Sequence, residues 1–177
     1  MNKLLIGSLL NYTIVFVYIY ISYKYGSLKN WKPYYSTILF FILGNAIYGL
    51  LFLHHYPLWV YNDIFLGHTL ADFLTMFIYF PLTTLIFLPN YPSKFSKQLM
   101  YNIIWVIIYT GNELMYYYLG SIEYHNGWNI LWSAFHNTYQ FPLIRLHQKN
   151  PILAWAFSFG MLGLIMLIFK FPIRNLP

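Results

Sequence analysis

The chain has no cysteine among its 177 residues. Disulfide bonds, thiol catalysis and thiolate metal sites are therefore all excluded. The same absence removes S-acylation and prenylation as membrane anchors, because both modifications attach to a cysteine. Any association with a membrane must come from the side chains of the chain itself.

Charged side chains are also scarce. They make up 8% of the residues, whereas soluble domains usually carry about a quarter. Hydrophobic residues reach 59% and aromatic residues 23%, so most of the surface must face lipid. The net charge of +6 comes from basic residues at the ends of apolar runs, which points to lipid headgroups rather than nucleic acid. We therefore expect an integral membrane protein with the lipid bilayer as its partner, and homo-oligomer formation stays open.

Six apolar segments are long enough to cross a bilayer, which takes roughly 20 residues of helix. They are residues 4–23, 34–53, 67–88, 98–119, 128–146 and 152–171. The first segment has no small-x-small cleavage site after it, so we expect a retained helix rather than a signal peptide. The connections are short and leave no room for a soluble domain. The sequence thus predicts a single all-α integral membrane domain, a polytopic transmembrane bundle of about six helices.

The basic residues predict the orientation of this bundle. The second and fourth connections carry no Lys or Arg, whereas the first, third and fifth carry Lys24, Lys29, Lys32, Lys94, Lys97, Arg145 and Lys149. Three basic residues, Lys3, Lys170 and Arg174, fall on the opposite side and weaken the contrast without reversing it. Because cytoplasmic connections carry the excess of positive charge, we expect both termini to face outward.

Polar residues inside the predicted spans are the candidates for a functional site, because a charged group in a membrane helix is costly unless it is paired or hydrated. At a rise of about 1.5 Å per residue, the ionisable ones all fall within roughly 12 Å of the outer surface. Carboxylates suited to catalysis are Asp72 and Glu113, and amides suited to ligand binding are Asn45, Asn112 and Gln140.

Histidines accompany these residues in the same outer layer. His68 and Asp72 are four residues apart, so they share one helix face. The set His68, Asp72, His125 and His136 suits Zn, Mn or Fe, with Glu113 as the general base. The alternative interpretation is a hydrogen-bonded polar core that only fixes helix packing.

Six short stretches together carry a family resemblance. They are Leu43-Gly44-Asn45, Tyr56-Pro57-Leu58-Trp59, Gly67-His68-Thr69-Leu70-Ala71-Asp72, Leu88-Pro89-Asn90-Tyr91-Pro92, Tyr124-His125-Asn126-Gly127-Trp128-Asn129 and Arg145-Leu146-His147-Gln148-Lys149-Asn150-Pro151. They resemble a family of small multi-pass membrane proteins from Gram-positive, endospore-forming bacteria, from about Trp31 to the C-terminus. That family has no assigned activity, so the resemblance implies a bacterial plasma-membrane location and contributes no catalytic residues.

Three classes of function fit these observations. The first is an ion- or proton-linked or small-solute transport or sensing protein, since buried carboxylates and histidines form relays and ion sites in such proteins. The second is an intramembrane metal-dependent hydrolase acting on a lipid or amide. The third is a non-catalytic membrane protein that binds a ligand or a partner. A transporter predicts a path that continues inward past Asn45 and Gln140, whereas a hydrolase predicts a closed pocket.

Overall fold

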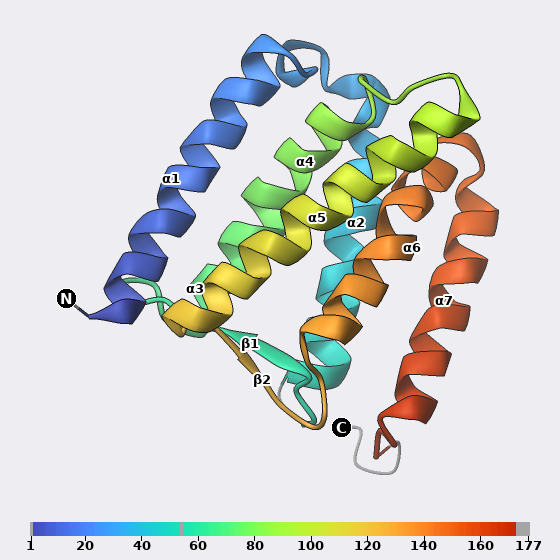
Figure 1. Ribbon diagram of the computed structural model, residues 1–177. Coiled ribbons are helices and arrows are strands. Elements are labelled where there is room, and N and C mark those ends of the chain that lie inside the picture. The colour runs from blue at the N-terminus through green and yellow to red at the C-terminus, as the bar shows by residue number, and fades with distance from the viewer. Residues whose placement is uncertain (1, 54, 173–177) are drawn as a thin grey trace.

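The computed structural model describes residues 2–53 and 55–172, and it is a bundle of helices that lie side by side (Figure 1). The α-helices are α1 (Lys3–Lys24), α2 (Tyr35–Tyr48), α3 (Gly67–Leu74), α4 (Phe80–Phe87), α5 (Phe95–Leu119), α6 (Ile130–Lys149) and α7 (Pro151–Ile168). Shorter elements are the 3-10 turns η1 (Leu28–Asn30) and η2 (Lys32–Tyr34), the π-helical segments η3 (Gly49–Leu53) and η4 (Thr75–Tyr79), and the strands β1 (Trp59–Tyr61) and β2 (Ile122–Tyr124).

Four helical stretches are long and apolar enough to cross a membrane. They are Lys3–Lys24, Lys32–Leu53, Gly67–Phe87 and Pro151–Ile168. The third contains α3, η4 and α4 in direct succession, so a π-helical segment interrupts it midway. These stretches agree closely with the predicted spans 4–23, 34–53, 67–88 and 152–171.

The helices α5 and α6 occupy the positions of the remaining two predicted spans. They are 25 and 20 residues long, which is sufficient to cross a bilayer. Their composition is more polar than that of the other four, because α6 contains Asn137, Gln140 and Arg145 and α5 contains Asn112 and Glu113. A six-span arrangement therefore stays a prediction for these two helices.

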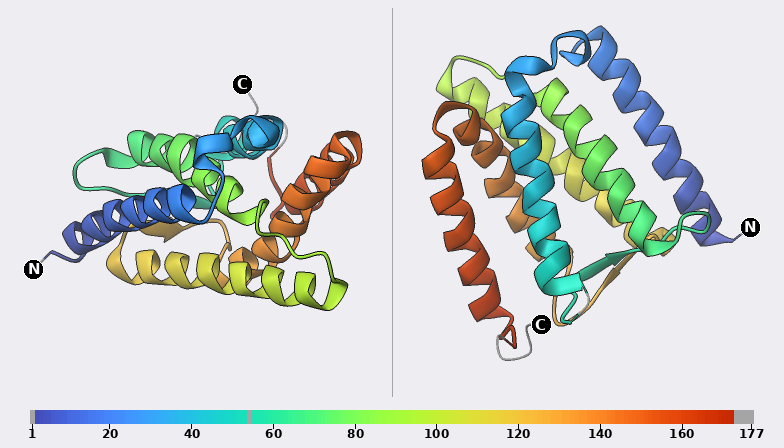
Figure 2. Two further views of the ribbon diagram at one scale, coloured as in Figure 1. Left: turned by 90° about the horizontal axis from the view of Figure 1, so that it is seen from above. Right: turned by 180° about the vertical axis from the view of Figure 1, so that it is seen from behind.

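The connections divide between the two ends of the bundle (Figure 1 and the right view of Figure 2). The α1–α2, α4–α5 and α6–α7 connections lie at one end, and they carry most of the basic residues. The start of α1, the two strands and the end of α7 lie at the other end. Successive helices therefore run in opposite directions, as the short connections require. Arg174, one of the basic residues used to predict the orientation, lies outside the described residues.

The prediction of an all-helical fold is confirmed, and the structure adds one short feature that was not predicted. The second and fourth connections pair as a short antiparallel ribbon, in which Trp59 is opposite Tyr124, Val60 opposite Glu123 and Tyr61 opposite Ile122. Strands of three residues are too short to show the alternation that identifies a strand in a sequence. The ribbon joins the ends of helix pairs that are distant in the sequence and holds this end of the bundle together.

Aromatic rings fill the centre of the bundle. Phe87 and Phe141 are fully buried, and the rings of Phe41 and Phe80 stack with their centroids 4.0 Å apart. This core joins α1, α2, α4, α5 and α6. In contrast, α7 lies at the edge of the bundle and packs chiefly against α6 (Figure 2, left). Most of its apolar side chains are exposed, as expected of a helix whose surroundings are lipid.

Candidate functional site

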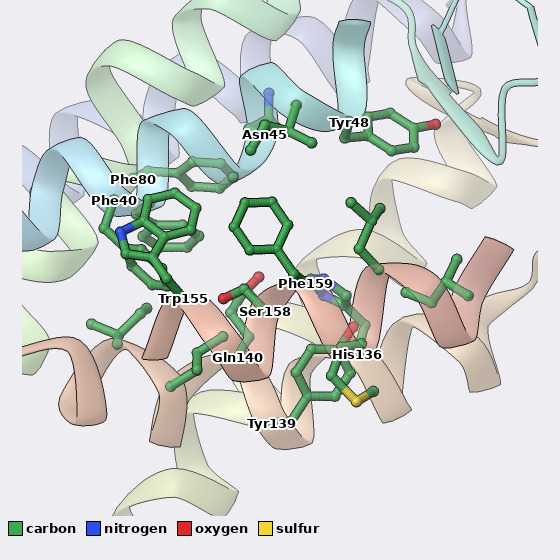
Figure 3. Close-up of a pocket in the computed structure, with 18 of the residues that line it drawn as sticks. Phe40, Asn45, Tyr48, Phe80, His136, Tyr139, Gln140, Trp155, Ser158 and Phe159 are labelled. Carbon is green, nitrogen blue, oxygen red and sulfur yellow. The ribbon is translucent and has the colours of Figure 1, made fainter. Parts of the chain in front are cut away.

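A cavity of about 170 Å³ lies between α2, α6 and α7. Most of its lining is aromatic or aliphatic, and Figure 3 shows the rings of Phe40, Trp155 and Phe159 around the space. We call it the aromatic cavity, and its principal residues are Phe40, Gly44, Asn45, Tyr48, Phe80, His136, Tyr139, Gln140, Trp155, Ser158 and Phe159. The loose contact between α2 and α7 leaves this space, because α7 is held mainly by α6.

Two polar side chains of α6 contribute to this wall. His136 and Gln140 are four residues apart, so they lie one turn from each other on one face of the helix. The Gln140 amide nitrogen is buried and has no hydrogen-bond partner among the described residues. The His136 ring also makes no hydrogen bond within the described part of the chain, and its neighbours are the rings of Tyr139 at 5.0 Å and Trp59 at 6.3 Å. A buried donor without a partner is costly, so Gln140 favours a ligand that carries an acceptor. Its nitrogen has almost no accessible surface, so the side chain must turn to meet a solute in the cavity.

Two polar residues of α2 have structural partners instead. The Asn45 amide nitrogen donates a hydrogen bond to the Asp72 carboxylate at 3.1 Å, which joins α2 to α3 while Asn45 also lines the cavity. The Tyr48 hydroxyl accepts from the amides of Leu58 and Trp59 and donates to the Trp59 carbonyl at 2.7 Å. Its ring stacks on that of Trp59, with the centroids 3.8 Å apart. Tyr48 therefore anchors β1 to α2, and its hydroxyl points away from the cavity (Figure 3).

The predicted catalytic residue Glu113 lies elsewhere, between α5, α6 and the ribbon. Its Oε1 atom accepts a hydrogen bond from the Tyr124 hydroxyl at 2.8 Å and a second from the Ser133 hydroxyl. Ser133 in turn accepts from the Trp128 indole nitrogen at 2.8 Å. The neighbouring Asn112 donates to the Tyr79 hydroxyl at 3.1 Å. Of the three amides predicted to bind ligand, Asn45 and Gln140 therefore line the aromatic cavity and Asn112 does not.

The predicted metal site is not assembled. Among the described residues, no group of three or more His, Asp and Glu side chains is placed to hold a metal ion. His68 is exposed and hydrogen-bonded to Thr69, and Asp72 is paired with Asn45. The set of His68, Asp72, His125 and His136 therefore offers no shared centre for Zn, Mn or Fe.

The remaining two predicted ligands are also apart. The His125 ring lies 3.8 Å from the Glu123 carboxylate in the ribbon, and both side chains are partly exposed. His136 faces the aromatic cavity. Helix rise placed these residues at a similar depth, but depth gives no position around the bundle axis. These residues lie at different positions around the axis, so they do not meet as a metal site.

Some residues of the site carried no signal in the sequence. Trp155, Ser158 and Phe159 of α7 line the cavity, yet their segment is apolar on every face and was predicted only to be a membrane-spanning helix. Tyr124, which binds Glu113, stands in a connection whose strand was not predicted.

Four apolar helices of membrane-spanning length and a bundle built around aromatic rings define a membrane-embedded helical protein. Comparison with family models, with curated proteins and with solved structures finds no match to the chain. The resemblance to a family of small membrane proteins from endospore-forming bacteria stays a prediction.

Proposed function

We propose that this chain is a multi-pass protein of the bacterial plasma membrane that binds a small solute in the aromatic cavity, as a transport or sensing protein. The observation that carries the proposal is an apolar cavity whose wall includes two polar side chains of α6, Gln140 and His136. The Gln140 amide nitrogen is buried without a hydrogen-bond partner among the described residues. Ligand sites commonly pair a mostly apolar lining with a few polar groups that fix orientation.

The volume of the cavity limits the size of the solute. Its 170 Å³ is close to the roughly 150 Å³ of an engineered protein cavity that holds one benzene molecule. Pockets for drug-sized ligands span about 300–1,000 Å³, so the part of a solute that this partly open cavity encloses is smaller than a drug-sized ligand. The expected solute has one ring or a comparable branched body, together with one hydrogen-bond acceptor that faces Gln140.

The hydrolase alternative has less support. Hydrolysis by a metal-bound water requires a ligand set that holds the metal near a carboxylate base. The described residues gather no such set, and Glu113 does not line the cavity that contains His136. A non-catalytic ligand-binding protein uses the same cavity as a transporter, and solute flux into liposomes containing the purified protein separates these two functions.

Pairs of solutes with the same shape and different polarity test the proposal. We expect cyclohexanone to raise the midpoint of thermal unfolding of the detergent-purified protein more than cyclohexane does, because only the ketone accepts a hydrogen bond. The variant Gln140→Leu should bind both compounds alike. The ketone should lose about 5- to 150-fold in affinity, since an unmade buried hydrogen bond costs about 1–3 kcal/mol. The proposal is wrong if a panel of ring-sized solutes leaves the midpoint unchanged.

A further inference from the structure

The three connections opposite the ribbon are joined into one surface. The α1–α2, α4–α5 and α6–α7 connections lie together at this end of the bundle (Figure 1). The Asn90 side-chain amide donates to the Tyr25 carbonyl at 3.0 Å, which joins the α4–α5 connection to the α1–α2 connection. The Gln148 amide at the end of α6 donates to the Pro33 carbonyl at 3.0 Å. We call this surface the basic end, and these bonds give it a defined shape.

Side-chain charge at the basic end is of one sign. Most of the ten Lys and Arg residues of the chain are here, namely Lys24, Lys29, Lys32, Lys94, Lys97, Arg145 and Lys149. The chain has only four Asp and Glu residues. All of them lie toward the ribbon, since Asp63 follows β1, Asp72 is in α3, Glu123 is in β2 and Glu113 bonds Tyr124 of β2. The described side chains form no ion pair at the basic end, so its positive charge is left for an external partner.

Arg145 differs from the other basic side chains of this end because it is partly buried, whereas the others are exposed. Its guanidinium carbon Cζ lies 5.1 Å from the centre of the Tyr91 ring, so it joins α6 to the α4–α5 connection. The Tyr91 hydroxyl accepts a hydrogen bond from the Asn102 amide at 3.0 Å, and its ring meets the Tyr101 ring edge to face. Because an aromatic face attracts a guanidinium, this fixed ring holds Arg145 in place.

The Arg145 guanidinium has donors to spare. Its Nε atom is enclosed without a partner, and its terminal nitrogens also make no hydrogen bond with a described residue. Only Nε is enclosed, so the terminal nitrogens are open to a partner from the surroundings. Arg145 lies one helical turn before Lys149, about 6 Å deeper along α6. A long basic side chain at that depth reaches the level of the lipid headgroups.

We propose that the basic end binds an anionic phospholipid, whose phosphate is held by the terminal nitrogens of Arg145 beside Tyr91. The planar fork of a guanidinium matches the spacing of phosphate oxygens, and basic pockets between membrane helices bind anionic headgroups. The unneutralised positive charge selects an anionic lipid, because a zwitterionic lipid carries a positive group next to its phosphate. The orientation predicted from the basic residues puts this end at the cytoplasmic leaflet, whose surface is negative. The inference does not depend on solute binding in the aromatic cavity.

Lipid-dependent stability of the detergent-purified, full-length protein tests this proposal. The midpoint of thermal unfolding is measured against the concentration of dioleoyl phosphatidylglycerol or dioleoyl phosphatidylcholine at constant ionic strength. A ligand that binds only the folded state raises stability with the logarithm of its concentration once it exceeds its Kd. We expect phosphatidylglycerol to act at lower concentration and to raise the midpoint further than phosphatidylcholine does. Equal effects of the two lipids would overturn the proposal.

Soluble anions separate a lipid from the other occupants of a basic surface. Glycerol phosphate carries the phosphate without acyl chains, and polyglutamate represents an acidic protein segment. Neither should raise the midpoint when lipid is absent. The proposal is overturned if either compound acts as strongly as phosphatidylglycerol, since the partner would then be a soluble phosphate or an acidic protein.

Matched variants assign the effect to Arg145. Arg145→Gln should weaken the apparent affinity for phosphatidylglycerol by about tenfold or more, since hydrogen bonds to charged groups are the stronger ones. Lys29→Gln removes the same charge from an exposed side chain of another connection and should lose clearly less. Equal losses in these two variants would show a diffuse basic surface and overturn the proposal. Arg145→Lys keeps the charge and the apolar stem but lacks the planar fork, so it should fold and weaken the affinity several-fold. If Arg145→Gln does not fold, a normal response of Arg145→Lys overturns the proposal instead.

Discussion

The Tyr12 hydroxyl donates a hydrogen bond of 2.7 Å to the Asp63 carboxylate and so ties α1 to the connection between β1 and α3. The same carboxylate oxygen accepts from the backbone amides of Phe65 at 2.8 Å and Leu66 at 2.9 Å. Asp63 thereby satisfies two amides that immediately precede α3. Burial acts to raise the pKa of Asp63, but its hydrogen bonds outweigh burial and hold that pKa below the ordinary value.

This bond network predicts acid sensitivity. Because the pKa of Asp63 is lowered on folding, its carboxylate stabilises the protein above the ordinary pKa of about 3.9. That contribution is lost as the pH falls through the folded-state pKa. The unfolding midpoint of the unmodified protein should exceed that of Asp63→Asn at neutral pH, and the difference should shrink below about pH 4. A difference that stays constant down to pH 3 would contradict the assignment, and Glu123→Gln provides the exposed control.

The hydrogen bonds at Glu113 predict coupled losses of stability. Ser133→Ala leaves both the Trp128 indole and the Glu113 carboxylate with one bond fewer, and Tyr124→Phe removes the other bond to Glu113. Each change should cost about 1–3 kcal/mol in the free energy of unfolding in detergent. The two losses should differ from additivity by about 0.5 kcal/mol or more, since both residues bond one oxygen.

A neighbouring hydroxyl on α6 provides the control for this cycle. Thr138 is exposed, and its hydroxyl bonds only the Phe135 carbonyl of its own helix. Thr138→Ala should therefore change the free energy of unfolding by less than about 0.5 kcal/mol. Strict additivity of Ser133→Ala and Tyr124→Phe would show that the two hydroxyls do not share Glu113.

The absence of cysteine makes the orientation directly measurable. Single cysteines at Lys29, Lys94 and Glu123 lie at exposed positions of three different connections. A membrane-impermeant maleimide applied to intact cells should label Glu123→Cys, and it should label Lys29→Cys and Lys94→Cys only after lysis. Labelling of Lys94→Cys and Glu123→Cys from the same side would show that α5 does not cross the membrane.

Depth along the bundle was predictable from the sequence, because the length and hydropathy of each apolar run are local properties. The runs at 4–23 and 152–171 became α1 and α7 within a few residues. The predicted span 67–88 is one continuous stretch, although its π-helical middle could not be anticipated from composition. The same reasoning identified Asn45, Gln140 and His136 as unusual residues, and all three line the aromatic cavity.

Position around the bundle axis was not predictable, because it depends on how the helices pack. Asp72 pairs with Asn45 of α2 rather than with the histidines at its own depth. Glu113 turns toward Tyr124, whose strand exists only because β1 and β2 pair across the bundle. The contribution of α7 to the cavity likewise follows from its loose packing against α2, and nothing local in its sequence records that.

Filling the aromatic cavity from within tests the solute-binding account most directly. Gly44 lines the cavity, and a Cβ atom there would meet nothing within 4 Å. Gly111 on α5 is equally unobstructed and does not line the aromatic cavity. Replacing either glycine in a helix interior by leucine should preserve or raise stability, by up to about 1 kcal/mol.

The decisive measurement is the equilibrium affinity of the best-binding ring-sized solute for Gly44→Leu and Gly111→Leu. The account predicts that Gly44→Leu loses at least tenfold in affinity, because the leucine side chain occupies the space between α2 and α7, while Gly111→Leu binds as the unmodified protein does. Equal affinities in the two variants would contradict the account and place the solute outside the aromatic cavity.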